Sequence, residues 1–374
     1  MSFAGVYHTV LLQNDGRATA CGNGDDGQIN IPGGATCSQV SAGIYHTVLL
    51  QSNGHAVAFG HNNVGQCNVP ELPEGVTYSQ ASAGGRHTVL LGSDGQAVAC
   101  GDNDDGQCSI PELPDGVTYV QVSAGRYHTG LLRSDGRAIA CGRNDDERCN
   151  IPELPDGITY TQMSAGKSHT VLLQSDGRAV ACGHNASGQC NIPALPSGVT
   201  YSQVSAGGAH TVLLQSDGRA VACGNNDDGE CNIPELPEGI TYSQVSAGDS
   251  HTVFLRSDGQ AVACGDNDFG QCNIQGLPEG KTYVGSIAPA PLNVLQIAFT
   301  DAGDLTRLTC ISLGGEEVCT VMIGKGDTIA SLQPRIAEEI GTKALNLSLV
   351  LPDGRLLYSM PLSTHICDLL SACS

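Results

Sequence analysis

One segment recurs seven times along this chain of 374 residues and restricts the folds that the chain can adopt. Residues 169–190 read HTVLLQSDGRAVACGHNASGQC, and similar segments begin at six other histidines. The seven histidines are His8, His46, His87, His128, His169, His210 and His251. The first interval between them is 38 residues, and the other five are 41 residues each. A fixed period of this length indicates a repeat architecture, in which each unit packs against its neighbours.

Each repeat contains three segments with the residue pattern of a β-strand. Near the sixth histidine, the first is Tyr201–Gly207, the second begins at His210, and the third reads Arg-Ala-Val-Ala-Cys-Gly. An Asp-Gly pair, such as Asp176-Gly177, precedes the third segment and supplies the positive φ that a tight hairpin requires. A fourth, short strand is expected at Cys190–Pro193, on the outer edge, because proline cannot donate a hydrogen bond to a further strand.

Four antiparallel strands in a unit of this length match the size of a propeller blade. The first repeat lacks the strand that precedes each of the others, and Thr282-Tyr283-Val284 stands alone after the seventh repeat. We expect these two ends to meet in one composite blade that closes the ring. The prediction is a mainly β fold, in which residues 1–284 form a seven-bladed β-propeller of four-stranded antiparallel blades.

The chain does not continue the repeat after residue 284. Residues 285–293 contain two Ala-Pro pairs and are expected to be a linker. Residues 294–374 are expected to form a small α+β domain with a helix from about Asp327 to Ile340. Its strands are expected at Val294–Phe299, Leu308–Ser312, Val318–Ile323 and Leu345–Leu351. This order of elements resembles the ubiquitin-like β-grasp fold, most clearly over Leu308–Leu357.

Three motifs of the repeat are similar to those of the regulator of chromosome condensation family. They are Ser-Ala-Gly-x-x-His-Thr, as in Ser205–Thr211, then Asp-Gly-Arg-Ala-Val-Ala-Cys-Gly, and then Asn-x-x-Gly-Gln, as in Asn185–Gln189. The resemblance covers residues 3–284 and implies a seven-bladed propeller. The family usually has Trp where this chain has Cys or Phe before the glycine, and Leu where this chain has Cys after Gly-Gln.

The family includes exchange factors for the Ran GTPase, plant ultraviolet-B photoreceptors, and propellers attached to ubiquitin ligases. Photoreception is not expected, because the chromophore there is a tryptophan cluster and this chain has no Trp. Chromatin binding by the exchange factor uses basic extensions that this chain lacks. Ligase activity would require a catalytic domain, so the resemblance leaves exchange activity and a role as a ubiquitin-pathway adaptor as alternatives.

The net charge of −21 argues against two classes of partner. An acidic surface repels phosphate backbones and anionic lipid, so we expect neither nucleic acid nor membrane as a partner. The chain begins without a basic and apolar signal segment, and we expect its 17 cysteines to be reduced. We therefore expect the protein to be in the cytoplasm, with the nucleus as the alternative location. We also expect it to be a monomer.

The repeated histidines and cysteines suggest metal or disulfide sites, but their pattern favours structural roles. One histidine per blade places the seven on a ring, where we expect the ring nitrogens to bond backbone. Five cysteine pairs are spaced eight residues apart, but Ile29 and Phe59 replace one member in the first two repeats, so we expect buried free thiols. The loop Asp102–Gly106 lacks the spacing of a calcium loop. No catalytic residue, metal or cofactor is expected.

The two positions before each repeated histidine vary most between repeats, which indicates an exposed surface. Tyrosine and arginine are common there, and both are enriched at the centres of protein interfaces. The loop after the third strand of each blade is expected to share this face, and it adds Arg143. The candidate partner-binding residues are Tyr7, Tyr45, Arg86, Arg126, Tyr127, Arg143 and Lys167. The alternative is that exposed positions vary without function.

These observations favour a non-enzymatic scaffold or adaptor that binds a protein partner on one propeller face. A guanine-nucleotide exchange factor for a small GTPase is the first alternative, and a substrate adaptor linked to the ubiquitin machinery is the second.

Overall fold

The computed structural model of the chain describes residues 3–34, 36–278 and 280–284 with their side chains. Beyond residue 284 it describes the backbone of four strands. The chain divides into two compact units, Met1–Ala288 and Pro289–Ser374. Among the described residues, no helix is long and apolar enough to span a membrane.

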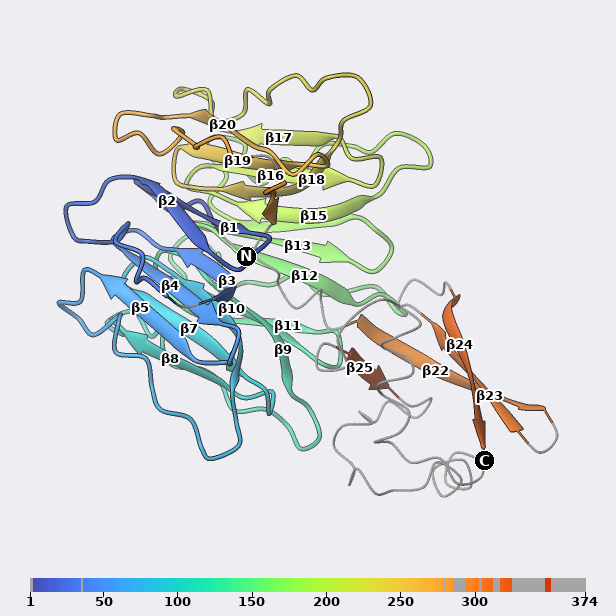
Figure 1. The fold of residues 1–374 in the computed structure, drawn as a ribbon. Helices are drawn as coiled ribbons and strands as arrows, with labels where there is room; N and C mark the ends of the chain where they lie inside the picture. The colour runs from blue at the N-terminus through green and yellow to red at the C-terminus, as the bar shows by residue number, and fades with distance from the viewer. Residues whose placement is uncertain are drawn as a thin grey trace. The chain divides into compact units, whose positions relative to one another are not determined.

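The first unit consists of seven three-stranded antiparallel sheets, which follow one another from blue to orange in Figure 1. The middle strands are β1 (His8–Gln13), β4 (His46–Gln51), β7 (His87–Gly92), β10 (His128–Arg133), β13 (His169–Gln174), β16 (His210–Gln215) and β19 (His251–Arg256). The outer strands are β2 (Ala18–Gly22), β5 (Ala56–Gly60), β8 (Ala97–Gly101), β11 (Ala138–Gly142), β14 (Ala179–Gly183), β17 (Ala220–Gly224) and β20 (Ala261–Gly265). The inner strands are β3 (Cys37–Ala42), β6 (Tyr78–Ala83), β9 (Tyr119–Ala124), β12 (Tyr160–Ala165), β15 (Tyr201–Ala206), β18 (Tyr242–Ala247) and the short β21 (Tyr283–Val284).

The expected fourth strand of each blade is absent from the described propeller, so the prediction of four-stranded blades was wrong. At Cys190–Pro193 the backbone makes a compact turn, in which the N–H of Ile192 donates to the carbonyl of Cys190 at 2.9 Å. Pro193 has no N–H, so this segment lacks the donors that an additional strand needs. The segment instead packs Ile192 and Leu195 against the hydrophobic core between two blades.

The hydrophobic core lies between neighbouring blades. Between the fifth and sixth repeats it contains Val171 from β13, Tyr201 and Val204 from β15, and Leu213 from β16. The hydroxyl of Tyr201 donates to the carbonyl of Pro193 at 2.7 Å, which ties the start of the inner strand to the loop before it. The core therefore positions both the strands and the loops between them.

The two ends of the repeat region contribute to one sheet. The strand β21 pairs with β1 through Leu12↔Val284 and Gln13↔Tyr283. At the other end of β1, Ala4 forms a bridge with Thr9, and the N–H of Val10 donates to the carbonyl of Phe3 at 2.9 Å. The inner edge of this sheet is thus made of two short segments from opposite ends of the unit.

A ring of backbone hydrogen bonds joins the seven blades near their inner strands. In each repeat, the residue after the Ser-Ala-Gly position donates its N–H to the equivalent glycine carbonyl of the next repeat. The donor–acceptor pairs are Val6–Gly43, Ile44–Gly84, Gly85–Gly125, Arg126–Gly166, Lys167–Gly207, Gly208–Gly248 and Asp249–Gly5. Because the last pair returns to the first repeat, the ring of blades is closed.

The second unit contains a sheet in the order β24-β23-β22-β25. Its strands are β22 (Asn293–Ala302), β23 (Leu305–Ile311), β24 (Glu317–Gly324) and β25 (Leu347–Val350). The pairing of β22 with β25 is parallel, and the other two pairings are antiparallel. The helix expected from Asp327 to Ile340 lies outside the described residues, and the likeness to a β-grasp fold stays a prediction.

Candidate partner-binding face

The repeated histidines join neighbouring blades. The Nε2 of His46 lies 2.9 Å from the Oγ1 of Thr88 in the next repeat, and that hydroxyl donates to the carbonyl of Gln66 at 2.7 Å. Since the threonine proton is used on the carbonyl, the histidine must donate from Nε2. The seven His–Thr pairs are His8–Thr47, His46–Thr88, His87–Thr129, His128–Thr170, His169–Thr211, His210–Thr252 and His251–Thr9. The expected bonds to backbone are therefore replaced by bonds to a threonine hydroxyl.

The histidine rings are fully buried and neutral. Burial lowers the pKa of His46 to about 3 and that of His87 to about 4. The remaining nitrogen, Nδ1, has no hydrogen-bond partner in any of the seven rings. Within the described residues, no group of three His, Cys, Asp or Glu side chains could hold a metal ion. The histidines thus hold the blades together and do not meet at one site.

The 13 described cysteines are free thiols, but they are less buried than expected. Cys37 is buried and the other 12 are partly buried. Each partly buried thiol contacts a backbone carbonyl, as Cys190 does with the carbonyl of His184 at 3.3 Å. Burial raises the pKa of Cys190 to about 11, so the thiol stays protonated at neutral pH.

The residues before each histidine and the loops after each outer strand lie at the same end of the propeller. The N–H of His61, just after β5, donates to the carbonyl of Tyr45 at 2.9 Å. The N–H of Arg143 donates in the same way to the carbonyl of Tyr127. We call this end the loop face. All seven candidate residues from the sequence, Tyr7, Tyr45, Arg86, Arg126, Tyr127, Arg143 and Lys167, belong to it.

An aromatic group crosses three repeats of the loop face. The rings of Tyr7 and Tyr45 are 5.8 Å apart, and the ring of Phe269 meets Tyr7 edge-on at 5.1 Å. His61 extends the group, with its ring 5.9 Å from Tyr45. Phe269 is the one exposed large hydrophobic side chain among the described residues, at 48%. An exposed phenylalanine packed on a tyrosine is typical of a contact surface for another protein.

A cationic group follows on the fourth repeat, centred on Tyr127. The guanidinium carbon of Arg126 lies 5.3 Å from the centre of the Tyr127 ring, and that of Arg143 lies 5.6 Å from it. The Nε of Arg126 also donates to the Tyr127 hydroxyl at 3.0 Å. Arg86, in the third repeat, is 3.7 Å from Asp102. The structure brings Arg126, Tyr127 and Arg143 together, and the sequence did not predict that Tyr127 stacks on two arginines.

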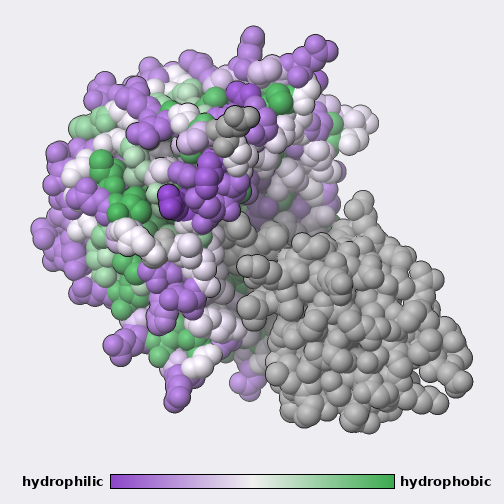
Figure 2. Space-filling view, viewed as in Figure 1, coloured by the Kyte–Doolittle hydropathy of each residue, from purple (hydrophilic) through white to green (hydrophobic). Residues whose placement is uncertain are grey.

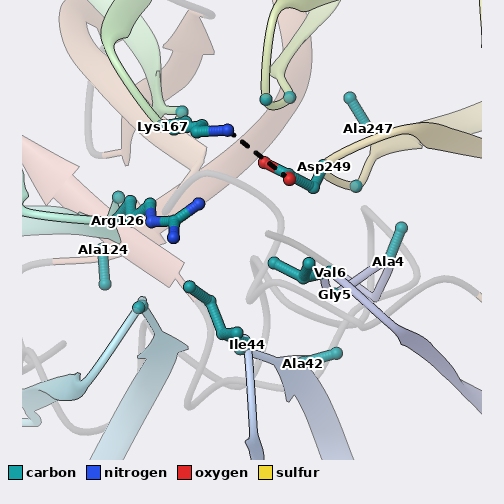
Figure 3. Close-up of a pocket in the computed structure, with 18 of the residues that line it drawn as sticks. Ala4, Gly5, Val6, Ala42, Ile44, Ala124, Arg126, Lys167, Ala247 and Asp249 are labelled. Carbon is teal, nitrogen blue, oxygen red and sulfur yellow. Dashed lines mark ion pairs between the residues drawn. The ribbon is translucent and has the colours of Figure 1, made fainter. Parts of the chain in front are cut away.

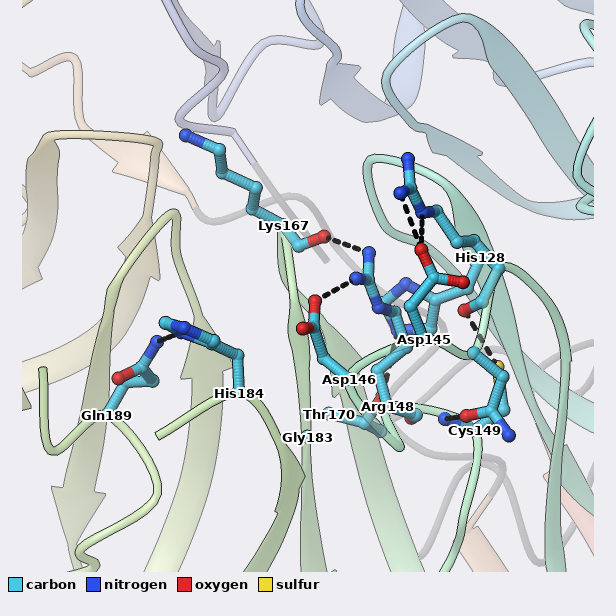
Figure 4. Close-up of polar contacts among 12 residues, drawn as sticks. His128, Asp145, Asp146, Arg148, Cys149, Lys167, Thr170, Gly183, His184 and Gln189 are labelled. Carbon is cyan, nitrogen blue, oxygen red and sulfur yellow. Dashed lines mark hydrogen bonds and ion pairs between the residues drawn. The ribbon is translucent and has the colours of Figure 1, made fainter. Parts of the chain in front are cut away.

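The fourth repeat also departs from the others in the loop after its outer strand (Figure 4). Arg148 replaces the glutamine of the Gly-Gln motif and is buried, with its Nη1 donating to the carbonyl of Lys167 at 3.0 Å. It also forms an ion pair with Asp146. Glu147 precedes it with φ of 64°, where the other six repeats have glycine. In the fifth repeat, by contrast, Gln189 bonds His184 at 3.0 Å.

The first residue of each variable pair lines a small cavity on the propeller axis, about 70 Å³ in volume (Figure 3). Its variable lining consists of Val6, Ile44, Gly85, Arg126, Lys167, Gly208 and Asp249. Lys167 lies 3.7 Å from Asp249 across the cavity, whereas the guanidinium of Arg126 points into it. The sequence identified Arg126 and Lys167 as candidates but gave no sign that they border an axial cavity.

Hydropathy over the molecular surface is mixed. In the view of Figure 2, hydrophilic side chains project from the edges of the described surface, and smaller hydrophobic areas lie between them.

Sequence reasoning missed Phe269, because a single apolar residue in a polar loop produces no periodic pattern. Comparison of the seven loops shows it, because its position holds Asp26, Val64, Asp105, Asp146, Ser187 and Asp228 in the other repeats.

Comparison with known protein families identifies the repeat. The model of the regulator of chromosome condensation (RCC1) repeat matches residues 37–66, 78–107, 119–147, 160–189, 201–230 and 242–271. Comparison with curated protein sequences gives no match.

Several solved structures share the fold. Prp20p from Saccharomyces cerevisiae, in a study of its binding to Gsp1p and histones, has a TM-score of 0.55 and 20% identity, covering 67% of this chain and 77% of that chain. Human WBSCR16 has a TM-score of 0.56 and 18% identity, covering 67% of this chain and 84% of that chain. The ectodomain of the Physcomitrella patens receptor kinase CR4 has a TM-score of 0.57 and 16% identity, covering 87% of each chain. The six matches show that residues 37–271 contain regulator of chromosome condensation (RCC1) repeats, and the solved structures share the fold that these repeats form.

Proposed function

We propose that the chain is a non-enzymatic scaffold that binds a protein partner through the loop face of its propeller. One observation carries the proposal: the residues that vary between otherwise uniform repeats gather at one end, where the exposed Phe269 packs on Tyr7, which in turn contacts Tyr45. The same end carries the arginines stacked on Tyr127. Aromatic and arginine side chains supply most of the binding energy in many protein interfaces.

The opposite end of the propeller provides a matched control surface. There the turns between middle and outer strands carry Arg137, Arg178 and Arg219, all of them exposed. Substitutions in these turns remove the same kind of charge from the same repeats or their neighbours. They leave the loop face unchanged.

The test is affinity capture followed by identification of the bound proteins. The bait would be the wild type, the loop-face variant Arg86→Ala/Arg126→Ala/Tyr127→Ala, and the control variant Arg137→Ala/Arg178→Ala/Arg219→Ala. We expect a partner that the wild type and the control capture and the loop-face variant loses. If the loop-face variant captures the same proteins as the wild type, the proposal is wrong.

Nucleotide exchange on a small GTPase is the second candidate. It is supported by the repeat family and by the shared fold with Prp20p, whose structure was described with its binding to Gsp1p. An exchange factor would act by binding the nucleotide-free GTPase, which requires surface and no covalent chemistry. Release of mant-GDP from a panel of small GTPases tests this function. Acceleration that Arg126→Glu abolishes and Arg137→Glu preserves would support it, and no acceleration from any member would favour the scaffold.

An adaptor role in the ubiquitin pathway remains a third proposal, which rests on the resemblance of the region after residue 293 to ubiquitin-like folds. Deletion of residues 294–374 tests it. An adaptor of this kind would lose ubiquitin-pathway proteins from its captured partners and keep those that bind the loop face. For all three functions we propose a cytoplasmic or nuclear location.

A further inference from the structure

Arg126 is an exception to the charge pairing of the propeller. The described part of the chain contains 12 lysine and arginine side chains, and ten of them form an ion pair with an aspartate. The two without an ion pair are Arg126 and Arg137. Arg137 lies in an exposed turn at the opposite end of the same blade. In a chain of net charge −21, a cation on the axis that forms no ion pair requires an explanation.

The contacts of Arg126 leave part of its guanidinium free. Its Nε donates to the hydroxyl of Tyr127 at 3.0 Å, and the same ring lies beneath the guanidinium carbon at 5.3 Å. These contacts fix the orientation of the group without neutralising its charge. The two terminal amino groups have no hydrogen-bond partner among the described residues. They form the planar pair of donors that binds a carboxylate through two parallel hydrogen bonds.

The cavity in front of Arg126 suits one small anionic group (Figure 3). Gly85 and Gly208 contribute no side chain to its lining, which keeps it open. Val6 and Ile44 provide apolar contacts, and Lys167 is already paired with Asp249 at 3.7 Å. A cavity of about 70 Å³ is several times the roughly 10–15 Å³ that one buried water requires, which leaves room for a carboxylate with a methylene group.

From this geometry we infer that the axial cavity receives the side-chain carboxylate of an aspartate or glutamate on a protein loop that docks on the loop face. One unpaired guanidinium balances the single negative charge of a carboxylate. A phosphate group carries about 1.5 to 2 negative charges at neutral pH, which one unpaired guanidinium does not balance, and Asp249, paired with Lys167, repels this larger charge more strongly than that of a carboxylate. The inference rests on the proposed function and adds the chemistry of the partner's central contact.

The test uses a phage-displayed library of cyclic peptides with a randomised loop, selected on the wild-type protein. Peptides that bind are synthesised, and their affinities are measured by fluorescence anisotropy against four proteins. These are the wild type, Arg126→Gln, the charge-preserving Arg126→Lys, and Arg137→Gln. Arg137→Gln removes the other unpaired arginine of the same blade and is the matched control. The side chain of Arg126 contacts only Tyr127 among the described hydrogen-bond and ring partners, so all four should melt at similar temperatures.

We expect the selected peptides to share an aspartate or glutamate. Arg126→Gln should weaken their binding roughly tenfold or more, Arg126→Lys should weaken it less, and Arg137→Gln should leave it unchanged. Replacement of the shared acid of the peptide by its amide should cause no further loss of affinity for the Arg126→Gln protein. This thermodynamic coupling would identify the contact directly.

Other outcomes would overturn the inference in distinguishable ways. The selected peptides could lack an acid, lose affinity for Tyr7→Ala and bind Arg126→Gln normally. That result would exclude the carboxylate contact, while the loop face would still be an interface. Displacement by acetate or inorganic phosphate at peptide-like concentrations would indicate a site for free small anions. Peptides insensitive to every loop-face substitution, or no selected peptide at all, would contradict the proposed function as well.

Discussion

At the residue scale, the glycine of each Ser-Ala-Gly position allows the blades to approach one another. A Cβ built on Gly125 would lie 2.5 Å from the carbonyl oxygen of Gly166 in the next repeat. It would also lie 2.6 Å from the ring of His128. Neither neighbour is free to move, because the first belongs to the ring of backbone hydrogen bonds and the second bonds Thr170.

Gly125→Ala is therefore expected to destabilise the propeller by about 1–3 kcal/mol, the usual cost of forcing an added group into a packed interior. Gly33→Ala is the control, because a Cβ on Gly33 meets nothing within 4 Å and its φ is not positive. Urea unfolding followed by circular dichroism measures both. Equal stability of Gly125→Ala and the wild type would show that the blades can separate at no cost.

Sequence reasoning did not assign a role to the threonine whose hydroxyl accepts the hydrogen bond from each histidine. Thr88→Val keeps the shape of the side chain but leaves the Nε2 proton of His46 and the carbonyl of Gln66 without their shared partner. Burying unpaired polar groups costs about 1–3 kcal/mol, and we expect a loss of stability of that size. Thr77→Val, at an exposed position, should change the free energy of unfolding by less than about 0.5 kcal/mol. Equal effects of the two substitutions would contradict the role of the Thr88 hydroxyl.

At the element scale, the seven middle strands each bring one neutral histidine to a blade interface, and together they make stability depend on pH. Burial lowers the pKa of His8, His46, His128 and His210 to about 3, and that of the other three to about 4, from an ordinary value of 6.5. The unfolded chain therefore binds more protons than the folded one between these values. Their contribution to stability is complete above pH 6.5 and is lost as the pH falls towards 4.

The loss approaches about 1.4 kcal/mol per pH unit for each histidine once the unfolded form is protonated. The urea concentration at the unfolding midpoint, measured at pH 7.5, 6.5 and 5.5, should fall steeply between pH 6.5 and pH 5.5. His55→Asn removes an exposed histidine and should leave the slope unchanged. A midpoint that stays constant down to pH 5.5 would mean that the seven rings are protonated in the folded protein.

The strands themselves were predictable because every repeat gives the same signal. Alternation in Tyr201–Gly207 and the Asp-Gly turn at Asp176-Gly177 locate inner, middle and outer strands correctly in the structure. The fourth strand was wrong because Cys190–Pro193 has apolar residues at strand-like spacing, while its N–H groups are used in a local turn. Composition cannot distinguish these two uses of the same residues.

The candidate face was predictable in part for a related reason. Variation between repeats picked out Tyr7, Arg126 and the other candidates, because scaffold positions are held constant by packing that recurs seven times. The axial cavity and the stacking of Tyr127 between arginines depend on how separate repeats are placed around the axis. A single repeat does not contain that information.

At the scale of the whole molecule, closure of the ring depends on strands from both ends of the first unit. Residues 1–22 supply β1 and β2, together with Phe3, which is buried, and the bridge of Ala4 with Thr9. Their removal would expose β21 and open the ring of inter-blade hydrogen bonds on two sides. We expect deletion of residues 1–22 to abolish the cooperative thermal transition of the propeller. A truncated protein that keeps the melting temperature of the wild type would show that six sheets are stable without closure.

The composite sheet also has a mechanical consequence. Inner and middle strands share five register pairs in each of the other six sheets, as Cys37–Ala42 does with β4, but β21 shares only two with β1. The rest of the chain is connected to the propeller through β21. A pulling force applied to the region after residue 284 therefore acts first on these two pairs and on the ion pair of Lys281 with Asp15. Under tension the propeller should open at this seam, while the six uninterrupted sheets bear load only afterwards.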